Sequence, residues 1–367
     1  MRIKSPAFIV AIVLFIAIAN GIEAAPPPLA LESFQYAWET IRDTHFDTNF
    51  NGLDWTAVRT KFLPRIEKAK SQQEVRDTIQ EMLDLLNVSH LMILPGTPQR
   101  RSPIDTNKPT PFKATEQKSP QQPLQMAPPS EAGTLGIEVR VLNNQIVVFR
   151  VAPNSPAAQN GIKPGWIIES IDDEPALDPT VDENKDAKHH REFLLWHNAA
   201  AMLKGAASEK CTLVVRNDAG EKKTLTIPRT RETGQPAKLG NLPTMFTHVA
   251  TNELKSPAGK RVGYLTFNLW MVPVIQSINE FIDVNRNSDG IIIDLRGNVG
   301  GIGGIVMGTA GHFAQNRPSL GKMKMRDNEL NFIAFTRPLD SQNHPTNIFR
   351  GKLAILVDNI SLSSSEL

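Results

Sequence analysis

The 367-residue sequence contains a single cysteine, Cys211, so the chain cannot form a disulfide within itself. It also lacks any CxxC pair or Cys/His cluster with the spacing of a structural zinc site. A large charge of one sign is missing too, because 40 Lys and Arg residues nearly balance 38 Asp and Glu residues. This balance gives no reason to expect a nucleic-acid or acidic-polymer partner.

Long apolar runs are scarce as well, and the one at residues 7–19 is shorter than the roughly 20 residues of a membrane-spanning helix. Basic residues Arg2 and Lys4 precede it, and small residues follow it up to Ala25. This arrangement predicts a signal peptide over residues 1–24 and an exported protein, periplasmic or secreted. An uncleaved N-terminus that anchors the protein in the membrane, facing the periplasm, is the alternative.

A chain of this length accommodates two or three domains, and 40% hydrophobic residues suffice for ordinary packed cores. Within residues 30–95, apolar residues recur at steps of three and four, which predicts an N-terminal helical domain. Asp54 is placed to cap a helix that begins at Trp55. Residues 96–130 are rich in proline, glutamine and serine, and they predict a disordered linker.

Residues 131–230 alternate between strand and turn patterns. Two paired strands are expected at 137–141 and 145–151, joined at Asn143 and Asn144. Ser155 marks the start of a short helix. A strand, a long helix and two further strands are then predicted at residues 166–171, 186–204, 211–216 and 223–227.

Residues 245–367 predict an α/β core, because apolar strand patterns alternate there with helical ones. Residues 290–295 are almost wholly apolar, as expected for a strand buried on both faces. Residues 353–357 predict a second buried strand. A strand at 262–269 and helices at 273–284 and 302–312 complete the predicted core.

The serine-rich segment after the last apolar strand is a candidate catalytic element. A serine held where a strand turns into a helix exposes its oxygen, and the amides of the turn favour developing negative charge. Ser363 is placed to be such a residue. Ser363 and Glu366 also have the S-x-x-E spacing of a helix capping box, which is a purely structural alternative.

A glycine-rich loop follows the apolar strand at 290–295 and spans residues 294–301. Glycines allow close approach of the backbone to a ligand, and their amides can form an oxyanion hole. The spacing fits neither of the common phosphate-binding motifs. A plain glycine-rich turn is the alternative.

The histidines give weaker signals. His90 stands among Leu86, Val88 and Leu91, and a histidine in such surroundings is more often packed than catalytic. His189, His190 and His197 lie on one predicted helix without carboxylates at ligand spacing, which favours a solvated face over a metal site.

Three groups of motifs resemble those of one enzyme family, and they occur in its order. Leu135, Gly136 and Ile137, with residues 152–157 and 161–166, resemble a PDZ domain of the circularly permuted bacterial type. Residues 263–267 and 294–301 resemble the core strand and glycine loop of tail-specific (C-terminal processing, tricorn-like) serine proteases. Residues 361–366 resemble the S-x-S-x-S-E nucleophile motif of that family, and the helical segment with Ser89 and His90 resembles its tricorn-like branch.

The resemblance implies a multidomain α+β protein with an N-terminal helical bundle, a PDZ-like β domain and an α/β catalytic core. It implies a serine endopeptidase acting on peptides or unfolded proteins, with no metal or organic cofactor. Ser363 would attack the carbonyl, and His90 would be the base, with Ser89 linking it to a glutamate. The oxyanion would be bound by amides of Gly301, Gly300 and Ser364. Leu135, Gly136 and Ile137 would receive a free apolar C-terminus of the substrate.

Two departures from the family pattern bear on these implications. Val299 stands where the family usually has a glycine. The sequence ends at Leu367, before the lysine of the Ser-Lys branch or the glutamate of the tricorn-like tetrad, so we expect a truncated core that is inactive alone. A Ser-His-Ser-Glu mechanism and a Ser-Lys mechanism both stay open. The alternative functions are a non-catalytic PDZ peptide-binding protein and a ligand-binding relative.

Overall fold

The computed structural model describes residues 27, 29–88, 91–93, 132–179, 181, 188–240 and 242–367. The chain divides into two compact units, residues 1–93 and 94–367. The predicted signal peptide, the predicted linker at 96–130, and Ser89 with His90 lie outside the described residues. No helix in the described part of the chain is long and apolar enough to cross a membrane.

The described residues of the first unit form three α-helices, which confirms the predicted helical bundle: α1 (Ala30–Thr44), α2 (Trp55–Glu67) and α3 (Gln72–Asp84). Asp54 caps α2 as expected, because its Oδ1 accepts hydrogen bonds of 3.0 Å from the amides of Thr56 and Ala57. Trp38 and Trp55 each donate an indole hydrogen bond to the other's carbonyl, at 2.8 and 3.0 Å. These bonds join α1 to α2 inside the apolar core.

The PDZ-like part of the second unit is built on a six-stranded sheet with the order β2-β3-β4-β7-β8 and β5 beside β4. Asn143 and Asn144 both have positive φ, at 48° and 60°, and form the two-residue turn between β2 and β3. A smaller sheet has the order β6-β1-β9, and the predicted alternation of strands and helices is confirmed. The bounds are β1 (Ala132–Thr134), β2 (Ile137–Leu142), β3 (Gln145–Val151), α4 (Pro156–Gln159), β4 (Ile167–Ile171), β5 (Glu174–Pro175), α5 (Lys188–Met202), β6 (Gly205–Ala206), β7 (Lys210–Arg216), β8 (Lys222–Pro228) and β9 (Thr230–Arg231).

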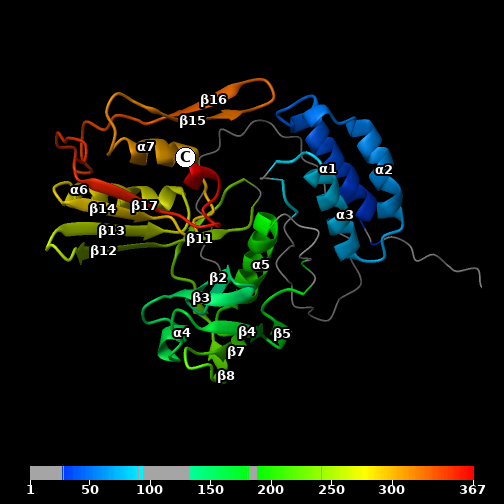
Figure 1. Ribbon diagram of the computed structural model, residues 1–367, viewed down its shortest axis with the longest axis horizontal. Coiled ribbons are helices and arrows are strands. Elements are labelled where there is room, and N and C mark those ends of the chain that lie inside the picture. The colour runs from blue at the N-terminus through cyan, green and yellow to red at the C-terminus, as the bar shows by residue number, and fades with distance from the viewer. Residues whose placement is uncertain are drawn as a thin grey trace, which may run out of the picture. The chain divides into compact units, whose positions relative to one another are not determined.

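The protease-like core is a four-stranded sheet with the order β12-β13-β14-β17, in which β13, β14 and β17 are parallel (Figure 1). Apolar side chains of β13 and β14 pack against α6 and α7 to form its core. The carboxyl ends of the three parallel strands meet at one edge, where the candidate catalytic loops begin. The bounds are β12 (Val249–Lys255), β13 (Arg261–Phe267), η2 (Val272–Val274), α6 (Ile275–Val284), β14 (Gly290–Asp294), α7 (Gly303–Ala310), β17 (Lys352–Leu356) and η3 (Ser363–Glu366).

The prediction of a second buried strand at 353–357 is wrong. Leu353, Ile355 and Val357 are 40%, 54% and 58% exposed. β17 is an edge strand that pairs with β14 alone in the described part of the chain, and four of its five residues are exposed because little of that part packs on either face. The run of apolar residues correctly predicted a strand, but it carried no information about its cover.

Two hairpins were not expected from the sequence. One joins β15 (Ser319–Lys324) to β16 (Glu329–Ile333), and the other joins β10 (Gln235–Ala237) to β11 (Met245–Thr247). Exposed Lys322 and Lys324 alternate with less polar neighbours in β15, so the segment has little apolar signal. Phe332 on β16 is buried against Gly303 of α7, and this tertiary contact holds the hairpin in place.

Candidate active site

Ser363 stands out among the serines of its segment by its backbone and its exposure. Its φ is 54°, in the left-handed region that residues with a side chain rarely adopt, and its side chain is exposed. Its hydroxyl makes no hydrogen bond within the described part of the chain. Its amide donates to Glu366 Oε2 at 2.6 Å. One half of the predicted capping box is therefore present, while the Ser363 hydroxyl is left available for chemistry.

The hydroxyl groups of the neighbouring serines are all engaged in hydrogen bonds. The Ser361 hydroxyl donates to the carbonyl of Leu295 at 2.7 Å, and the Ser364 hydroxyl donates to the carbonyl of Gly301 at 2.8 Å. Ser365 donates to Asn298 at 3.0 Å and accepts a 3.0 Å bond from the indole of Trp270. The bonds to Leu295, Asn298 and Gly301 tie the nucleophile turn to the glycine loop, and the bond from Trp270 ties it to the segment after β13. The sequence motif alone did not separate these roles.

The glycine loop passes directly beside Ser363. A Cβ added to Gly300 would lie 2.7 Å from the Cβ of Ser363 and 2.7 Å from the carbonyl oxygen of Leu362. Gly300 also has a φ of 98°. Only glycine fits this position without moving the nucleophile turn. Val299 needs no such freedom, and it packs beside Leu269 and Met271, which explains why the chain tolerates its departure from the family pattern.

The amides of the two loops differ in whether they are available. The Gly300 amide donates to Asn298 Oδ1 at 3.0 Å, so it is already engaged. The amides of Gly301 and Ser364 make no hydrogen bond to the described residues. Of the three predicted oxyanion donors, these two have unoccupied N–H groups.

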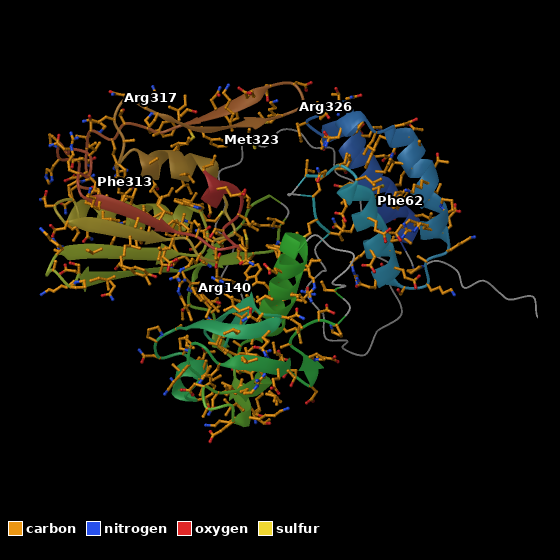
Figure 2. All side chains as sticks on the ribbon, viewed as in Figure 1. Phe62, Arg140, Phe313, Arg317, Met323 and Arg326 are labelled. Carbon is orange, nitrogen blue, oxygen red and sulfur yellow. The ribbon has the colours of Figure 1, made fainter. Side chains whose placement is uncertain are left out.

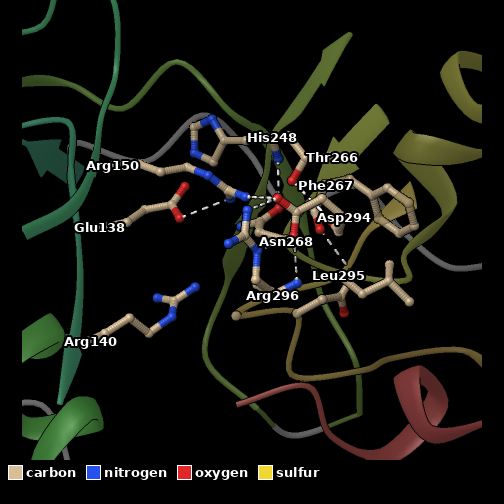
Figure 3. Close-up of polar contacts among 12 residues, drawn as sticks. Glu138, Arg140, Arg150, His248, Thr266, Phe267, Asn268, Asp294, Leu295 and Arg296 are labelled. Carbon is tan, nitrogen blue, oxygen red and sulfur yellow. Dashed lines mark hydrogen bonds and ion pairs between the residues drawn. The ribbon is translucent and has the colours of Figure 1, made fainter. Parts of the chain in front are cut away.

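Asp294, at the end of β14, anchors the start of the glycine loop. Its carboxylate accepts hydrogen bonds from Arg296 at 2.7 and 2.9 Å, from the Tyr264 hydroxyl at 2.5 Å, and from Arg150 at 2.6 Å (Figure 3). Burial alone would raise the pKa of Asp294, but the hydrogen bonds from Arg296 and Tyr264 outweigh it and lower that pKa to about 2. The carboxylate is therefore ionised at any physiological pH.

This pKa predicts an acid-dependent loss of stability. A carboxylate whose pKa falls from 3.8 to about 2 on folding stabilises the protein above pH ~4 by about 2 kcal/mol, and this contribution disappears as the pH falls towards 2. We expect Asp294→Asn to weaken the pH dependence of the free energy of unfolding between pH 5 and pH 3, measured by urea denaturation. Asp218→Asn, on an exposed turn, is the control. Equal slopes in wild type and Asp294→Asn would contradict the assignment.

Asp358, just after β17, holds the two loops together. Its Oδ1 accepts the amides of Gly297 at 2.9 Å and Ile360 at 3.0 Å, and its Oδ2 accepts Arg140 Nε at 2.7 Å. Burial raises the pKa of Asp358, but the charge of Arg140 and the Gly297 amide more than compensate and lower it. Neither Asp358 nor Arg140 was singled out from the sequence, because their pairing joins residues 218 positions apart.

The residues predicted to receive a peptide, at 135–137, lead into β2, an outer strand of the six-stranded sheet that pairs only with β3 among the described residues. Gly136 has a φ of 72°, and a Cβ there would meet the Cβ of Ser155 at 2.3 Å. Its amide donates to the Thr134 hydroxyl at 3.0 Å, while the Leu135 carbonyl accepts the amide of Ala157 at 3.1 Å. Leu135 is buried and Ile137 is partly buried. Helix α5 packs against β2.

The structure describes some of the histidines considered in the sequence and leaves out others. Ser89 and His90 lie outside the described residues, so the structure gives no geometry for the predicted base. The solvated-face interpretation is wrong for His197, which is partly buried and stacks on Phe193 with ring centroids 6.1 Å apart. Burial, helped by the charge of Lys204, lowers the pKa of His197.

Comparison with known families gives three matches along the chain. Residues 30–84 match the tricorn protease C1 domain, residues 133–191 match the PDZ domain, and residues 261–367 match peptidase family S41. The matched segments follow the order expected from the motifs. The first covers the three helices, the second covers β2 to β5 of the six-stranded sheet, and the third covers β13, β14 and β17 of the four-stranded sheet.

The chain is also similar to named processing proteases. It is 25% identical over 305 residues to carboxyl-terminal-processing peptidase 2, chloroplastic, of Arabidopsis thaliana, covering 80% of this chain and 50% of that protein. It is 23% identical over 273 residues to the carboxyl-terminal-processing protease of Picosynechococcus sp. PCC 7002, covering 72% and 53%. The chain thus spans about half the length of these relatives.

A solved structure, the photosystem II D1 C-terminal processing protease, is similar with a TM-score of 0.48 and 17% identity, covering 92% of this chain and 76% of that one. The domain matches, in the same order as the motifs, give the classification. This order, tricorn C1, PDZ and peptidase S41, together with the processing-protease relatives, is that of a tail-specific S41 serine protease with a PDZ domain.

Proposed function

We propose that the protein is a serine endopeptidase that cleaves peptides or unfolded proteins, with Ser363 as its nucleophile. The observation that carries the proposal is the contrast between Ser363 and its neighbours. Ser363 is exposed, strained and without a hydroxyl partner in the described chain, whereas Ser361, Ser364 and Ser365 are all used in tying loops together. Backbone strain and an exposed hydroxyl at a turn beside vacant amides are typical of a nucleophile.

In this proposal the Ser363 oxygen attacks the substrate carbonyl while a base removes its proton. The developing oxyanion lies against the amides of Gly301 and Ser364, and each such donor is worth about 3–4 kcal/mol in other enzymes. The protonated base then gives its proton to the leaving amine, and water releases the acyl group in a second cycle. Gly300 does not act as an oxyanion donor, because its amide is hydrogen-bonded to Asn298. Its lack of a side chain instead leaves room for the turn that holds Ser363.

For the base we propose His90, with Ser89 linking it to a glutamate, in keeping with the tricorn C1 domain that ends just before this pair. The unperturbed pKa of a histidine, about 6.5, suits a base near neutral pH, whereas a lysine would need strong desolvation. A downstream lysine is the alternative base.

For the whole protein we propose export to the periplasm or secretion, directed by a signal peptide at residues 1–24. A membrane anchor at the same residues is the alternative.

We propose further that the PDZ domain, which we place at residues 131–230, binds the free apolar C-termini of substrates by adding them as a strand to β2. Support comes from the open edge of β2 and from α5 beside it, since strand addition requires both a free edge and a flanking pocket. We place the N-terminal helical domain at residues 30–95 and the protease core at 245–367. A non-catalytic PDZ peptide-binding protein is the second candidate function, favoured if Ser363 proves unreactive.

Peptide binding tests whether the edge of β2 recognises a free C-terminal carboxylate. We expect a peptide with an apolar free C-terminus to bind at least about tenfold more tightly than the same peptide amidated, because the amide lacks the charge that backbone donors favour. Isothermal titration of both peptides into the Ser363→Ala protein measures this without cleavage. Gly136→Val should abolish the difference, since its side chain would collide with Ser155. Equal affinities in the parent protein would exclude carboxylate capture.

A further inference from the structure

Two arginines of the PDZ sheet reach into the catalytic loops. Arg140 on β2 donates through Nε to Asp358 Oδ2 at 2.7 Å, and Arg150 on β3 donates to Asp294 Oδ2 at 2.6 Å (Figure 3 shows the second pair). Figure 2 shows Arg140 where the PDZ sheet meets the protease core. Arg140 is the more deeply placed of the two, with a side chain 7% exposed against 27% for Arg150. A buried charge of this kind depends strongly on its partner.

The partner of Arg140 is the residue that joins both catalytic loops. While one oxygen of Asp358 accepts Arg140, the other accepts the amide of Gly297, in the glycine loop, and that of Ile360, in the nucleophile turn. Arg140 therefore fixes the orientation of a carboxylate on which the spacing of the two loops depends. Ser363 lies five residues after Asp358, and Gly301 lies four residues after Gly297.

Arg140 also contacts the backbone of the glycine loop directly. A Cβ at Gly297 would overlap its guanidinium group, so the loop backbone and the arginine are in direct contact. The guanidinium of Arg140 also lies over the ring of Phe149, with Cζ 4.3 Å from the ring centroid. Arg150 and Arg296 approach the same ring at 4.7 and 5.1 Å. A guanidinium held between an aromatic ring and a loop has little freedom to move.

We infer that Arg140 is a positioning residue for peptide-bond hydrolysis, supplied by the PDZ domain and acting through Asp358 and Gly297 on the amide of Gly301. This inference rests on the proposed peptidase function. Oxyanion donors act only when they lie about 2.7–3.1 Å from the developing charge, and misplacement by ~1 Å can cost about a hundredfold in rate. The PDZ domain would thus contribute to catalysis as well as to peptide capture.

The test is Arg140→Met in the full-length protein, a change that keeps an unbranched apolar stem and removes the charged guanidinium group. We expect kcat to fall about ten- to a hundredfold, with KM within about twofold of wild type, because the interaction serves the transition state. Arg140→Lys should recover part of kcat. Arg216→Met is the matched control, since Arg216 pairs with Glu169 inside the PDZ sheet at 3.1 Å, and it should leave kcat unchanged.

A second measurement is independent of activity. In the Ser363→Ala background, Arg140→Met should speed hydrogen exchange of the amides in residues 295–302, and Arg216→Met should not. If wild type cleaves nothing and Ser363 is unreactive, the proposed function fails, while this exchange difference still tests the positioning role. If wild type is active but Arg140→Met matches the Arg216→Met control in kcat and in exchange, the inference is overturned. A raised KM with unchanged kcat would also overturn it, because it would indicate substrate binding.

Discussion

Ser363→Ala is expected to lower kcat of the full-length protein by about 10⁴- to 10⁶-fold, the range lost when other serine hydrolases lose their nucleophile. The hydroxyl is exposed and makes no hydrogen bond to the described chain, so its removal should change the melting temperature little. Cleavage of an unfolded protein substrate measures kcat. Reaction with a fluorophosphonate, located by mass spectrometry, shows whether Ser363 is the reactive serine.

Ser365→Ala is the matched control for this prediction. Its hydroxyl joins Asn298 and Trp270, so the variant should lose stability but still be labelled at Ser363. His90→Ala, combined with Ser363→Ala, extends the test to the base. Members of one catalytic unit are not additive, so the double variant should be scarcely less active than Ser363→Ala alone. Near-normal kcat in His90→Ala would instead favour the lysine mechanism, and full activity of Ser363→Ala would reject the proposed function.

Gly300→Ala is expected to lower kcat by about a hundred- to a thousandfold, comparable to losing an oxyanion donor elsewhere. The new Cβ would lie 2.7 Å from the carbonyl oxygen of Leu362 and 3.0 Å from the amide of Ser364. Both neighbours are backbone atoms of the nucleophile turn, so relief of the clash must displace Ser363 or Ser364. The φ of 98° adds strain of about 1–3 kcal/mol, which thermal denaturation should detect.

Gly304→Ala is the control for the loop substitution, because a Cβ at Gly304 meets no atom within 4 Å and its φ is not positive. It lies on α7, only four residues from Gly300. We expect it to leave kcat near the wild-type value. Retention of wild-type kcat by Gly300→Ala would show that the glycine loop does not set the geometry of the nucleophile.

Local features and the order of the domains could be predicted from the amino-acid sequence alone. Apolar periodicity located α1, α2 and α3, and Asp54 began α2 as expected. Asn143 and Asn144 marked the β2–β3 turn because asparagine tolerates positive φ. The ordered motifs indicated the family, since each depends on a short stretch of chain with its own conformational requirements.

Three features depend on the folded chain: which serine is exposed, which amides are vacant, and how exposed β17 is. Ser361, Ser363 and Ser365 alternate identically in the sequence, yet only Ser363 has the left-handed backbone. The pairing of Arg140 with Asp358 spans 218 positions. Such contacts are absent from any local pattern, because burial, hydrogen-bond partners and electrostatic surroundings depend on segments that the fold brings together from distant parts of the chain.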